Sequence, residues 1–492
     1  MRSATDNAKK LESTEDYQVI SGATREMLIL SGLTLLALIT RSFQLSTGNF
    51  SGDEIYTVNF AGDRYSTLVN PAYYVLALAS FDLFGVSEFA ARLPAMLLGV
   101  IATPVFYATW RTLIGRNAAL IGALLIIFSS WHLFYSQFSR FYTGVFLFGS
   151  LSYYYFYQGL LRDDLVRVGG ALIAAAFGFF FHVTLVMVPA ACGAFALLVV
   201  LRPRAAQGAG LSKRVATTYL ALCLLVALVA LPLVWNLWQG RQSIGATWGG
   251  GPADLTLKVV RDVQLPIAFA AFFGLAVVLR KNAWLGMYFL VGIAIPLAFV
   301  LTAAAFLNSR SVYLFYSLPL IIALAGVLCE EVRCQLAADN RVASYSLTVI
   351  LLAMMVPEFV SHYTGRQSLD VRKAVNYIET HRHSGDVVLS FSDTFDYYAR
   401  KKYPVVDGLG HSRVRGHDRG EGMDDAIGDH ERAWVMVSRG RKPLARDLED
   451  WLSAHGRLVW RLPERRFDYT FRSYEIYLVE RQPALRSEHT SG

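Results

Sequence analysis

The chain has 492 residues, of which 54% are hydrophobic and only 17% charged, and its formal net charge is +8. Soluble domains carry about 25% charged residues, so the composition excludes an ordinary soluble protein and predicts a membrane protein. The positive charge predicts basic cytoplasmic loops and no nucleic-acid partner. Residues 1–26 are mostly polar, which predicts a cytoplasmic tail ahead of a retained first span rather than a cleaved signal peptide.

Apolar stretches long enough to cross a membrane, which takes roughly 17–25 residues, recur along the chain. We predict about eleven spans, at 27–46, 93–110, 118–135, 143–160, 165–181, 183–200, 215–236, 263–279, 283–307, 311–329 and 344–361. With residue 1 inside, the mostly basic connections face the cytoplasm, namely 110–117, 161–167, 201–214, 279–282 and 330–341. This alternation follows the distribution of Lys and Arg in membrane proteins. The segment 73–85 is too short to span, so we expect a helix in the outer interface.

The character of the chain changes after residue 362, where charges become frequent and long apolar runs end. Segments 386–391, 432–439 and 473–480 are predicted strands, and 443–456 is a predicted helix. We therefore expect three parts: a cytoplasmic tail over 1–26, a polytopic α-helical membrane domain over 27–362, and a small extracytoplasmic α/β domain over 363–492. The predicted location is the inner cell membrane, with the functional site and the last domain outside.

Two adjacent carboxylates, Asp53 and Glu54, follow the first predicted span in "GNFSGDEIYTVNF". One interpretation is a solvated acidic loop, because charged residues are normal just outside a span. The other is a functional site. Adjacent helical residues point in different directions, so at most one of the two carboxylates leads any chemistry.

The acidic pair is the first of five short motifs that occur in order. The acidic pair is followed by "VNPAYY" at 69–74, "SEFAARLP" at 87–94, "YSQFSRFY" at 135–142 and "NSRSVYLFYSLP" at 308–319. The series resembles the bacterial membrane glycosyltransferases of the family 39 type, which share the C-class fold and include protein O-mannosyltransferases and the lipid A aminoarabinose transferase. The resemblance covers roughly residues 25–330.

Three departures from the family pattern bear on the chemistry. Asn70 and Ala72 replace a basic or His residue and the second proline of the first motif, and Phe138 replaces a glutamate of the Tyr-Ser-Gln-Glu-Ala-Arg motif. The first change puts a cationic phosphate contact at position 70 in doubt. The change at 138 removes an acidic group of the type that holds a metal or an amine-bearing substrate. Arg140, Tyr142 and Asp53 still match.

The resemblance implies a sugar donor linked to a polyprenyl phosphate and an acceptor that is a glycan, a lipid or a protein. Asp53 is then the general base, which typically contributes about 10²–10⁴ in rate, and direct attack inverts the anomeric centre. Arg140 and Arg310 are expected to bind phosphate, because a guanidinium pairs with phosphate oxygens bidentately. Neither a cofactor nor a metal is predicted.

The remaining candidate substrate-binding residues each have a structural alternative. Glu54 binds acceptor hydroxyls, caps a helix or is a solvated residue. Asn70 contacts substrate or caps the interfacial helix through its side chain. His182 is a functional intramembrane group or a satisfied structural histidine. The alternative for Arg310 is a residue that only anchors a helix end. The connection 237–262, with three consecutive glycines, is a lid over the donor or a flexible link.

A function of a different class is a transporter or flippase of lipid-linked sugars, since many-span bundles often move substrates. Transporters tend to show internal repeats and paired mid-membrane breaks. No such repeat is evident in the sequence, and the polar candidates gather at one predicted face. We therefore favour the glycosyltransferase.

Overall fold

The computed structural model describes residues 23–62, 70–240, 251–306, 309–337, 342–368, 370–407, 421–439, 446–467 and 470–480. The chain divides into two compact units. The helical unit consists of Met1–Leu45, Phe60–Gly85 and Ala90–Phe359, and the sheet unit of Ser46–Asn59, Val86–Phe89 and Val360–Gly492.

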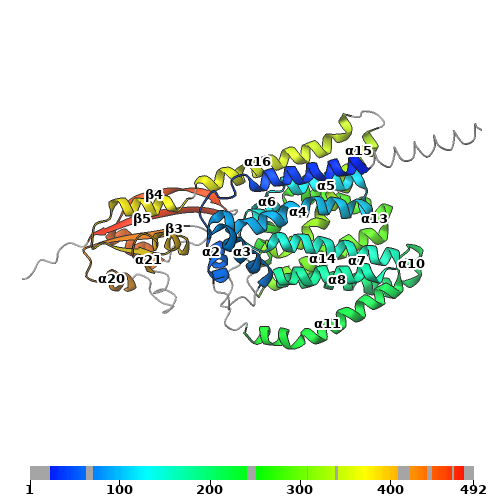
Figure 1. Ribbon diagram of the computed structural model, residues 1–492, viewed down its shortest axis with the longest axis horizontal. Helices are drawn as coiled ribbons and strands as arrows, with labels where there is room; N and C mark the ends of the chain where they lie inside the picture. Colours follow the sequence, from blue (N-terminus) through cyan, green and yellow to red (C-terminus); the bar gives the residue numbers. More distant parts are fainter. Residues whose placement is uncertain are drawn as a thin grey trace, which may run out of the picture. The chain divides into compact units, whose positions relative to one another are not determined.

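The helical unit is built from long apolar helices joined by short turns (Figure 1). After a first helix, Ala23–Ser42, its helices are α3 (Pro71–Phe84), α4 (Glu88–Ile114), α5 (Arg116–Phe128), α6 (Ser130–Ser136), α7 (Tyr142–Arg162), α8 (Leu165–Phe181), η1 (Val183–Val186), α9 (Met187–Leu201), α10 (Pro203–Gly208), α11 (Lys213–Gly240), α12 (Gly251–Val263), α13 (Leu265–Lys281), α14 (Ala283–Ala304), η3 (Ser311–Ser317), α15 (Leu318–Leu336), η4 (Ala343–Tyr345) and α16 (Ser346–Ser368). The boundary between the two units crosses two of these helices, so that the start of α4 and the end of α16 belong to the sheet unit.

By length and composition, six helices among the described residues could cross a membrane, or up to eight if each of two bent pairs is one span. The chain is therefore a multi-pass membrane protein. The count of eleven spans therefore stays a prediction. The predicted spans fall mainly on helices, but 27–46 runs past the helix end at Ser42, α8 has only 17 residues, and the predicted span 118–135 bends by 61° between α5 and α6. Of the predicted connection 237–262, residues 241–250 lie outside the described residues, and Gly251–Val263 is helix α12 instead of loop.

Glycines allow the helices of this unit to approach closely. A Cβ added to Gly274 would lie 2.0 Å from the Leu324 carbonyl oxygen, and one added to Gly326 would lie 2.3 Å from that of Ala118. Helix α15 therefore packs tightly against α13 on one side and α5 on another. Small residues at helix contacts are typical of membrane bundles, where packing replaces the hydrophobic driving force.

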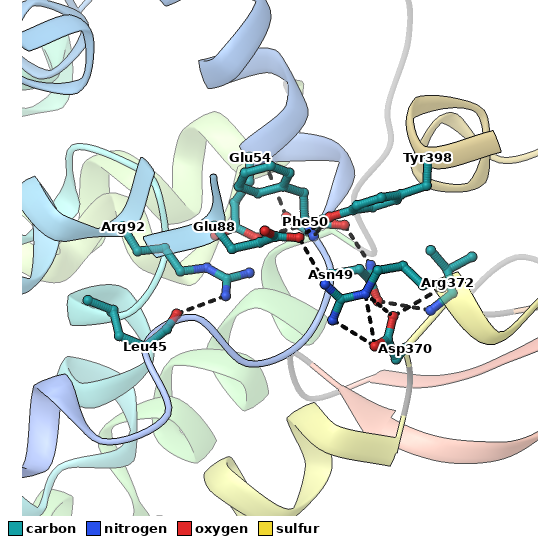
Figure 2. Close-up of polar contacts among 11 residues, drawn as sticks. Leu45, Asn49, Phe50, Glu54, Glu88, Arg92, Asp370, Arg372 and Tyr398 are labelled. Carbon is teal, nitrogen blue, oxygen red and sulfur yellow. Dashed lines mark hydrogen bonds and ion pairs between the residues drawn. The ribbon is translucent and has the colours of Figure 1, made fainter. Parts of the chain in front are cut away.

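Two fully buried arginines anchor the end of the first helix and the residues after it. Arg41 donates to the carbonyl oxygens of Ile126 and Ile127, both at 2.9 Å, where α5 ends before the bend. Arg92 donates to the Leu45 carbonyl at 3.0 Å (Figure 2). Carbonyls at a helix end have no intrahelical partner, so a buried guanidinium supplies their hydrogen bonds.

Within the described residues, the sheet unit contains a mixed sheet of five strands in the order β2-β1-β3-β5-β4. Its strands are β1 (Val387–Ser390), β2 (Val406–Asp407), β3 (Arg432–Arg439), β4 (Gly456–Phe467) and β5 (Thr470–Glu480). β1 pairs in parallel with β2 and β3, whereas β5 is antiparallel to β3 and β4. The helices of this unit are α2 (Gly52–Gly62), which runs across the boundary, α17 (Arg372–His381), α18 (Asp393–Ala399), α20 (Glu421–Ile427) and α21 (Arg446–His455).

Both faces of this sheet are covered by apolar side chains. Trp434 and Met436 of β3 pack with residues of α17 and α18, whereas Val435 and Val437 pack with residues of α20 and α21. The alternation follows from the two-residue side-chain period of a strand. The predicted strand at 432–439 is confirmed residue for residue.

Candidate active site

The two adjacent carboxylates lie in the first turn of α2. Ser51 precedes the helix, and its backbone N–H donates to the Glu54 Oε2 at 2.9 Å, while the Glu54 N–H donates to the Ser51 Oγ at 3.3 Å. This reciprocal pair is a capping box, in which a Ser and a Glu three residues later satisfy each other's backbone donors. Glu54 is 1% exposed. The helix-capping alternative for Glu54 is therefore what the structure shows.

Asp53 is the partly exposed member of the pair. Its backbone carbonyl accepts from the Thr57 hydroxyl at 3.5 Å one turn later, as expected inside a helix. A carboxylate in the first turn also interacts favourably with the positive end of the helix dipole. The same four-residue sequence thus gives two carboxylates different surroundings, one buried in the cap and one at the surface of the helix.

The residues just before α2 are bonded to other parts of the sheet unit (Figure 2). The Phe50 N–H donates to the Tyr398 hydroxyl at 2.7 Å, and the Val371 N–H donates to the Asn49 Oδ1 at 3.1 Å. Tyr398 in turn donates to the Glu88 Oε1 at 2.7 Å. The sequence analysis did not identify Tyr398, because 348 residues separate it from Phe50.

In the helical unit, Arg140, Tyr142 and His182 lie close together among aromatic rings. The Arg140 guanidinium lies 5.7 Å from the centroid of the Phe141 ring and donates to the Tyr74 hydroxyl at 3.4 Å. The Phe141 ring stacks on the His182 imidazole with centroids 4.7 Å apart. Tyr142 begins α7 and lies 5.9 Å from the same imidazole. The structure therefore brings three of the sequence-predicted residues into one cluster.

His182 lies in the turn between α8 and η1, outside both helices. The Thr184 N–H donates to its Nδ1 at 3.3 Å, so Nδ1 carries no proton and the neutral ring is protonated at Nε2. Burial, and secondarily the charge of Arg140, lower the pKa of His182 to about 4. The imidazole is consequently neutral near pH 7.

Arg310 joins this cluster through the short helix that follows it. It occupies the N-cap position of η3, and its carbonyl accepts from the Tyr313 N–H at 3.0 Å. The Tyr313 ring stacks on His182, with centroids 5.4 Å apart. The Arg310 side chain is exposed.

Asn70 precedes helix α3, which begins at Pro71. The residue has a left-handed backbone with φ of 59°, and its side chain makes no capping hydrogen bond. Asparagine tolerates this conformation better than most residues. The prediction that Asn70 caps this helix through its side chain is therefore wrong. Asn70 occupies the N-cap position, but its side chain forms no capping hydrogen bond.

Phe138, which replaces a glutamate of the family motif, is 5% exposed. Its ring packs 5.0 Å from Phe134 and 5.9 Å from Tyr135. An apolar aromatic cluster thus occupies the position of the acidic group. Among the described residues, no group of three or more His, Cys, Asp or Glu side chains is arranged to hold a metal ion.

Comparisons with known proteins agree with this architecture. A family model described as dolichyl-phosphate-mannose-protein mannosyltransferase matches residues 70–235. The fold is similar to the crystal structure of ArnT from Cupriavidus metallidurans in the apo state, with a TM-score of 0.58 and 12% identity over 93% of this chain and 98% of that chain. The comparison with curated protein sequences gives no match.

Two further solved structures share the fold. ArnT from Cupriavidus metallidurans bound to undecaprenyl phosphate has a TM-score of 0.57 and 13% identity, over 90% of this chain and 97% of that chain. The archaeal oligosaccharyltransferase AglB from Archaeoglobus fulgidus, in complex with an inhibitory peptide and a dolichol-phosphate, has a TM-score of 0.52 and 10% identity, over 83% and 69%.

These findings define the class of the protein. Its fold is shared with ArnT and with AglB. The family match and the fold together confirm the resemblance to the family 39 type, and they indicate that the chain is a membrane glycosyltransferase.

Proposed function

We propose that the protein transfers a sugar from a polyprenyl-phosphate donor to an acceptor on the extracytoplasmic face of the inner membrane. The description of the matching family contains a dolichyl-phosphate sugar, and two structures of the same fold hold undecaprenyl phosphate or dolichol-phosphate. The acceptor is a cell-envelope glycan, a lipid or a protein. In this proposal the chain has about eleven spans, and the domain 363–492 lies outside with the active site.

The observation that carries the mechanism is the different environment of the two adjacent carboxylates. The buried Glu54 carboxylate accepts from the Ser51 N–H and so completes the cap of α2. Asp53 is partly exposed one residue earlier. A general base has to reach an acceptor hydroxyl, which favours the exposed carboxylate over the buried one.

The proposed reaction is a single displacement with inversion. The acceptor oxygen forms a bond to the anomeric carbon while its proton passes to the Asp53 carboxylate. The bond between the anomeric carbon and the phosphate oxygen breaks, and the polyprenyl phosphate leaves with the electron pair. Arg140 and Arg310 stabilise the negative charge of this phosphate, because arginine binds phosphate oxygens bidentately. Little protonation of the leaving group is then needed.

The other sequence-predicted residues act on substrate orientation in this proposal. Asn70, Tyr142 and His182 contact the donor, with the neutral His182 able to donate only from Nε2. Glu54 contributes mainly through the cap that fixes the first turn of α2. The proposed reaction has no step that requires a cofactor or a metal.

The test is an assay of the purified full-length protein with a synthetic polyprenyl-phosphate sugar and a mixture of envelope acceptors. We expect a new glycoside whose anomeric configuration, measured by NMR, is opposite to that of the donor. Mass spectrometry of envelope glycans from cells with and without the protein then identifies the acceptor. Retention of configuration contradicts direct attack. Movement of labelled lipid across liposomes without a glycoside product favours the flippase.

A further inference from the structure

The segment that leads into α2 is bonded to the sheet unit through one phenol. Tyr398 belongs to α18, far along the chain from Phe50, and its hydroxyl accepts the Phe50 N–H at 2.7 Å. The two rings also lie near-parallel, with centroids 6.4 Å apart, and Tyr397 meets Phe50 edge-on at 5.6 Å. Phe50 is 1% exposed. Residue 50 is thus held by a hydrogen bond and by two aromatic contacts.

The Tyr398 hydroxyl donates its single proton to a second partner, the Glu88 carboxylate. Tyr398 donates to the Glu88 Oε1 at 2.7 Å, and Arg372 contacts that carboxylate at 3.3 Å (Figure 2). Arg372 is itself bonded to both carboxylate oxygens of Asp370. A phenol has one proton to donate and lone pairs to accept. The Tyr398 hydroxyl therefore links the "SEF" motif of Glu88 to the backbone at Phe50 in one continuous chain of bonds.

The phenol keeps its proton throughout the pH range of an enzyme assay. Burial raises the pKa of Tyr398 well above its usual value, and the hydrogen bond to Glu88 acts in the same direction, while the Phe50 N–H opposes the shift. A deprotonated oxygen could not donate to Glu88. The linkage is therefore independent of pH near neutrality.

Helix α18 is fixed to the sheet of the same unit. Ser392, just after β1, caps α18 by accepting from the Phe395 N–H at 3.4 Å. Phe395 is fully buried in the core that contains Trp434 and Met436 of β3. The position of Tyr398 is thus set by the sheet, and Tyr398 in turn sets the position of Phe50, three residues before Asp53.

We infer that Tyr398 is a positioning residue that orients the start of α2, and with it Asp53, for proton transfer; this inference rests on the proposed role of Asp53. Ser51 and Glu54 form the cap immediately after Phe50. A displaced residue 50 consequently tilts the whole first turn. The α/β sheet of this chain thereby holds the catalytic carboxylate in position.

The variant that tests this is Tyr398→Phe, which keeps the ring and removes the hydroxyl. The matched control is Tyr403→Phe, because the Tyr403 hydroxyl donates to the Val375 carbonyl at 3.1 Å within the apolar core of the same sheet. Full-length variants are assayed with a polyprenyl-phosphate sugar, and kcat, KM for the donor and Tm are measured. We expect Tyr398→Phe to lower kcat about tenfold with an unchanged donor KM, because small misplacements of a catalytic group cost up to 10²-fold. Tyr403→Phe should keep the kcat of the parent.

A double variant separates this inference from the proposed function. In an Asp53→Asn background, adding Tyr398→Phe should cause no further loss of kcat, since residues that act through one another are not additive. Glu88→Gln, which retains an oxygen to accept from Tyr398, should lose less than Tyr398→Phe. Normal kcat in Tyr398→Phe, an equal loss in Tyr403→Phe, or a full additional loss in the double variant each overturns the inference. Normal turnover in Asp53→Asn instead overturns the proposed base.

Discussion

The two regions that contain the candidate site residues hold their charged groups by different means. At the start of α2, backbone hydrogen bonds fix the acidic pair: Glu54 belongs to a capping box, and Phe50 is bonded to Tyr398. Around Arg140, the contacts are mainly between rings, with Phe141, His182 and Tyr313 stacked in series. Hydrogen bonds to the backbone impose a narrower geometry than ring stacking does.

This difference suits the different demands of the two proposed roles. Proton transfer requires a carboxylate within hydrogen-bond reach of the acceptor. Stabilising a phosphate is less demanding, because the charge is spread over several oxygens and attraction falls off gradually with distance. A rigid acidic region and a more adaptable cationic region are therefore what the proposed reaction needs. Four measurements test whether the two regions differ in this way.

The first prediction is all-or-none labelling, which tests whether the region of the acidic pair faces the outside. Single cysteines are introduced at Val86, Lys373 and Gln207, which are exposed, in a background from which the four native cysteines are removed, since Cys334 is exposed. A membrane-impermeant maleimide added to intact spheroplasts should label positions 86 and 373 and leave 207 unlabelled. Labelling of position 207 contradicts the proposed orientation, in which 201–214 faces the cytoplasm.

The second prediction concerns the two adjacent carboxylates. Asp53→Asn removes the proton acceptor and keeps the size, so we expect turnover to fall by about 10² or more, the usual contribution of a general base. Glu54→Gln is the matched control, because its amide oxygen can still accept from the Ser51 N–H. It should lower turnover only a few-fold. Purified-enzyme kinetics with donor binding measured separately check this. An equal loss of turnover in the two variants would mean that both carboxylates have a purely structural role.

The sequence predicted the elements that local patterning controls. The strand at 432–439 alternates between two apolar faces, and it forms over those residues. The apolar segments all became helix, because their hydropathy leaves few alternatives in a membrane. The signature Ser51-x-x-Glu54 is also local, which is why helix capping could be considered for Glu54 from sequence alone.

Features that depend on distant contacts could not be predicted. The bond between Phe50 and Tyr398 joins residues 348 positions apart. The bend at Ser129 interrupts a continuous apolar run, and the arginine that satisfies the carbonyls there, Arg41, belongs to the first helix. Strand β4 was missed because Arg457, Arg461 and Pro463 break the apolar pattern, which an edge strand tolerates.

The third prediction tests the cationic region. Arg140→Ala and Arg310→Ala should each lower donor use roughly tenfold or more, since a hydrogen bond to a charged group contributes about 1.5–3 kcal/mol. Lysine at either position should restore only part of the loss, because it lacks the bidentate fork. The readouts are kcat/KM for the donor and Tm. Parental values in both alanine variants would remove the phosphate role from this region.

The smallest expected effect is a pH-dependent shift in Tm that originates at His182. The pKa of this imidazole is about 4 in the folded protein, below the value of about 6.5 expected when it is unfolded. Between these values the unfolded chain binds a proton that the folded chain does not, so the free energy of unfolding falls as the pH drops from about 6.5 to about 4. His182→Phe keeps a stacking ring that cannot titrate. We therefore expect the parent to lose more Tm than this variant between about pH 7.5 and pH 5.

This comparison cancels the other titrating groups, which are shared by both proteins. The ring stack of Phe141, His182 and Tyr313 is retained in the variant, and only the bonds between Thr184 and Nδ1 are lost. A larger Tm loss on acidification in the parent shows that the cationic region disfavours a further positive charge beside Arg140. An equal loss of Tm in the two proteins means that His182 has the same pKa in the folded and the unfolded chain. The ring cluster is then more accessible to water than its packing indicates.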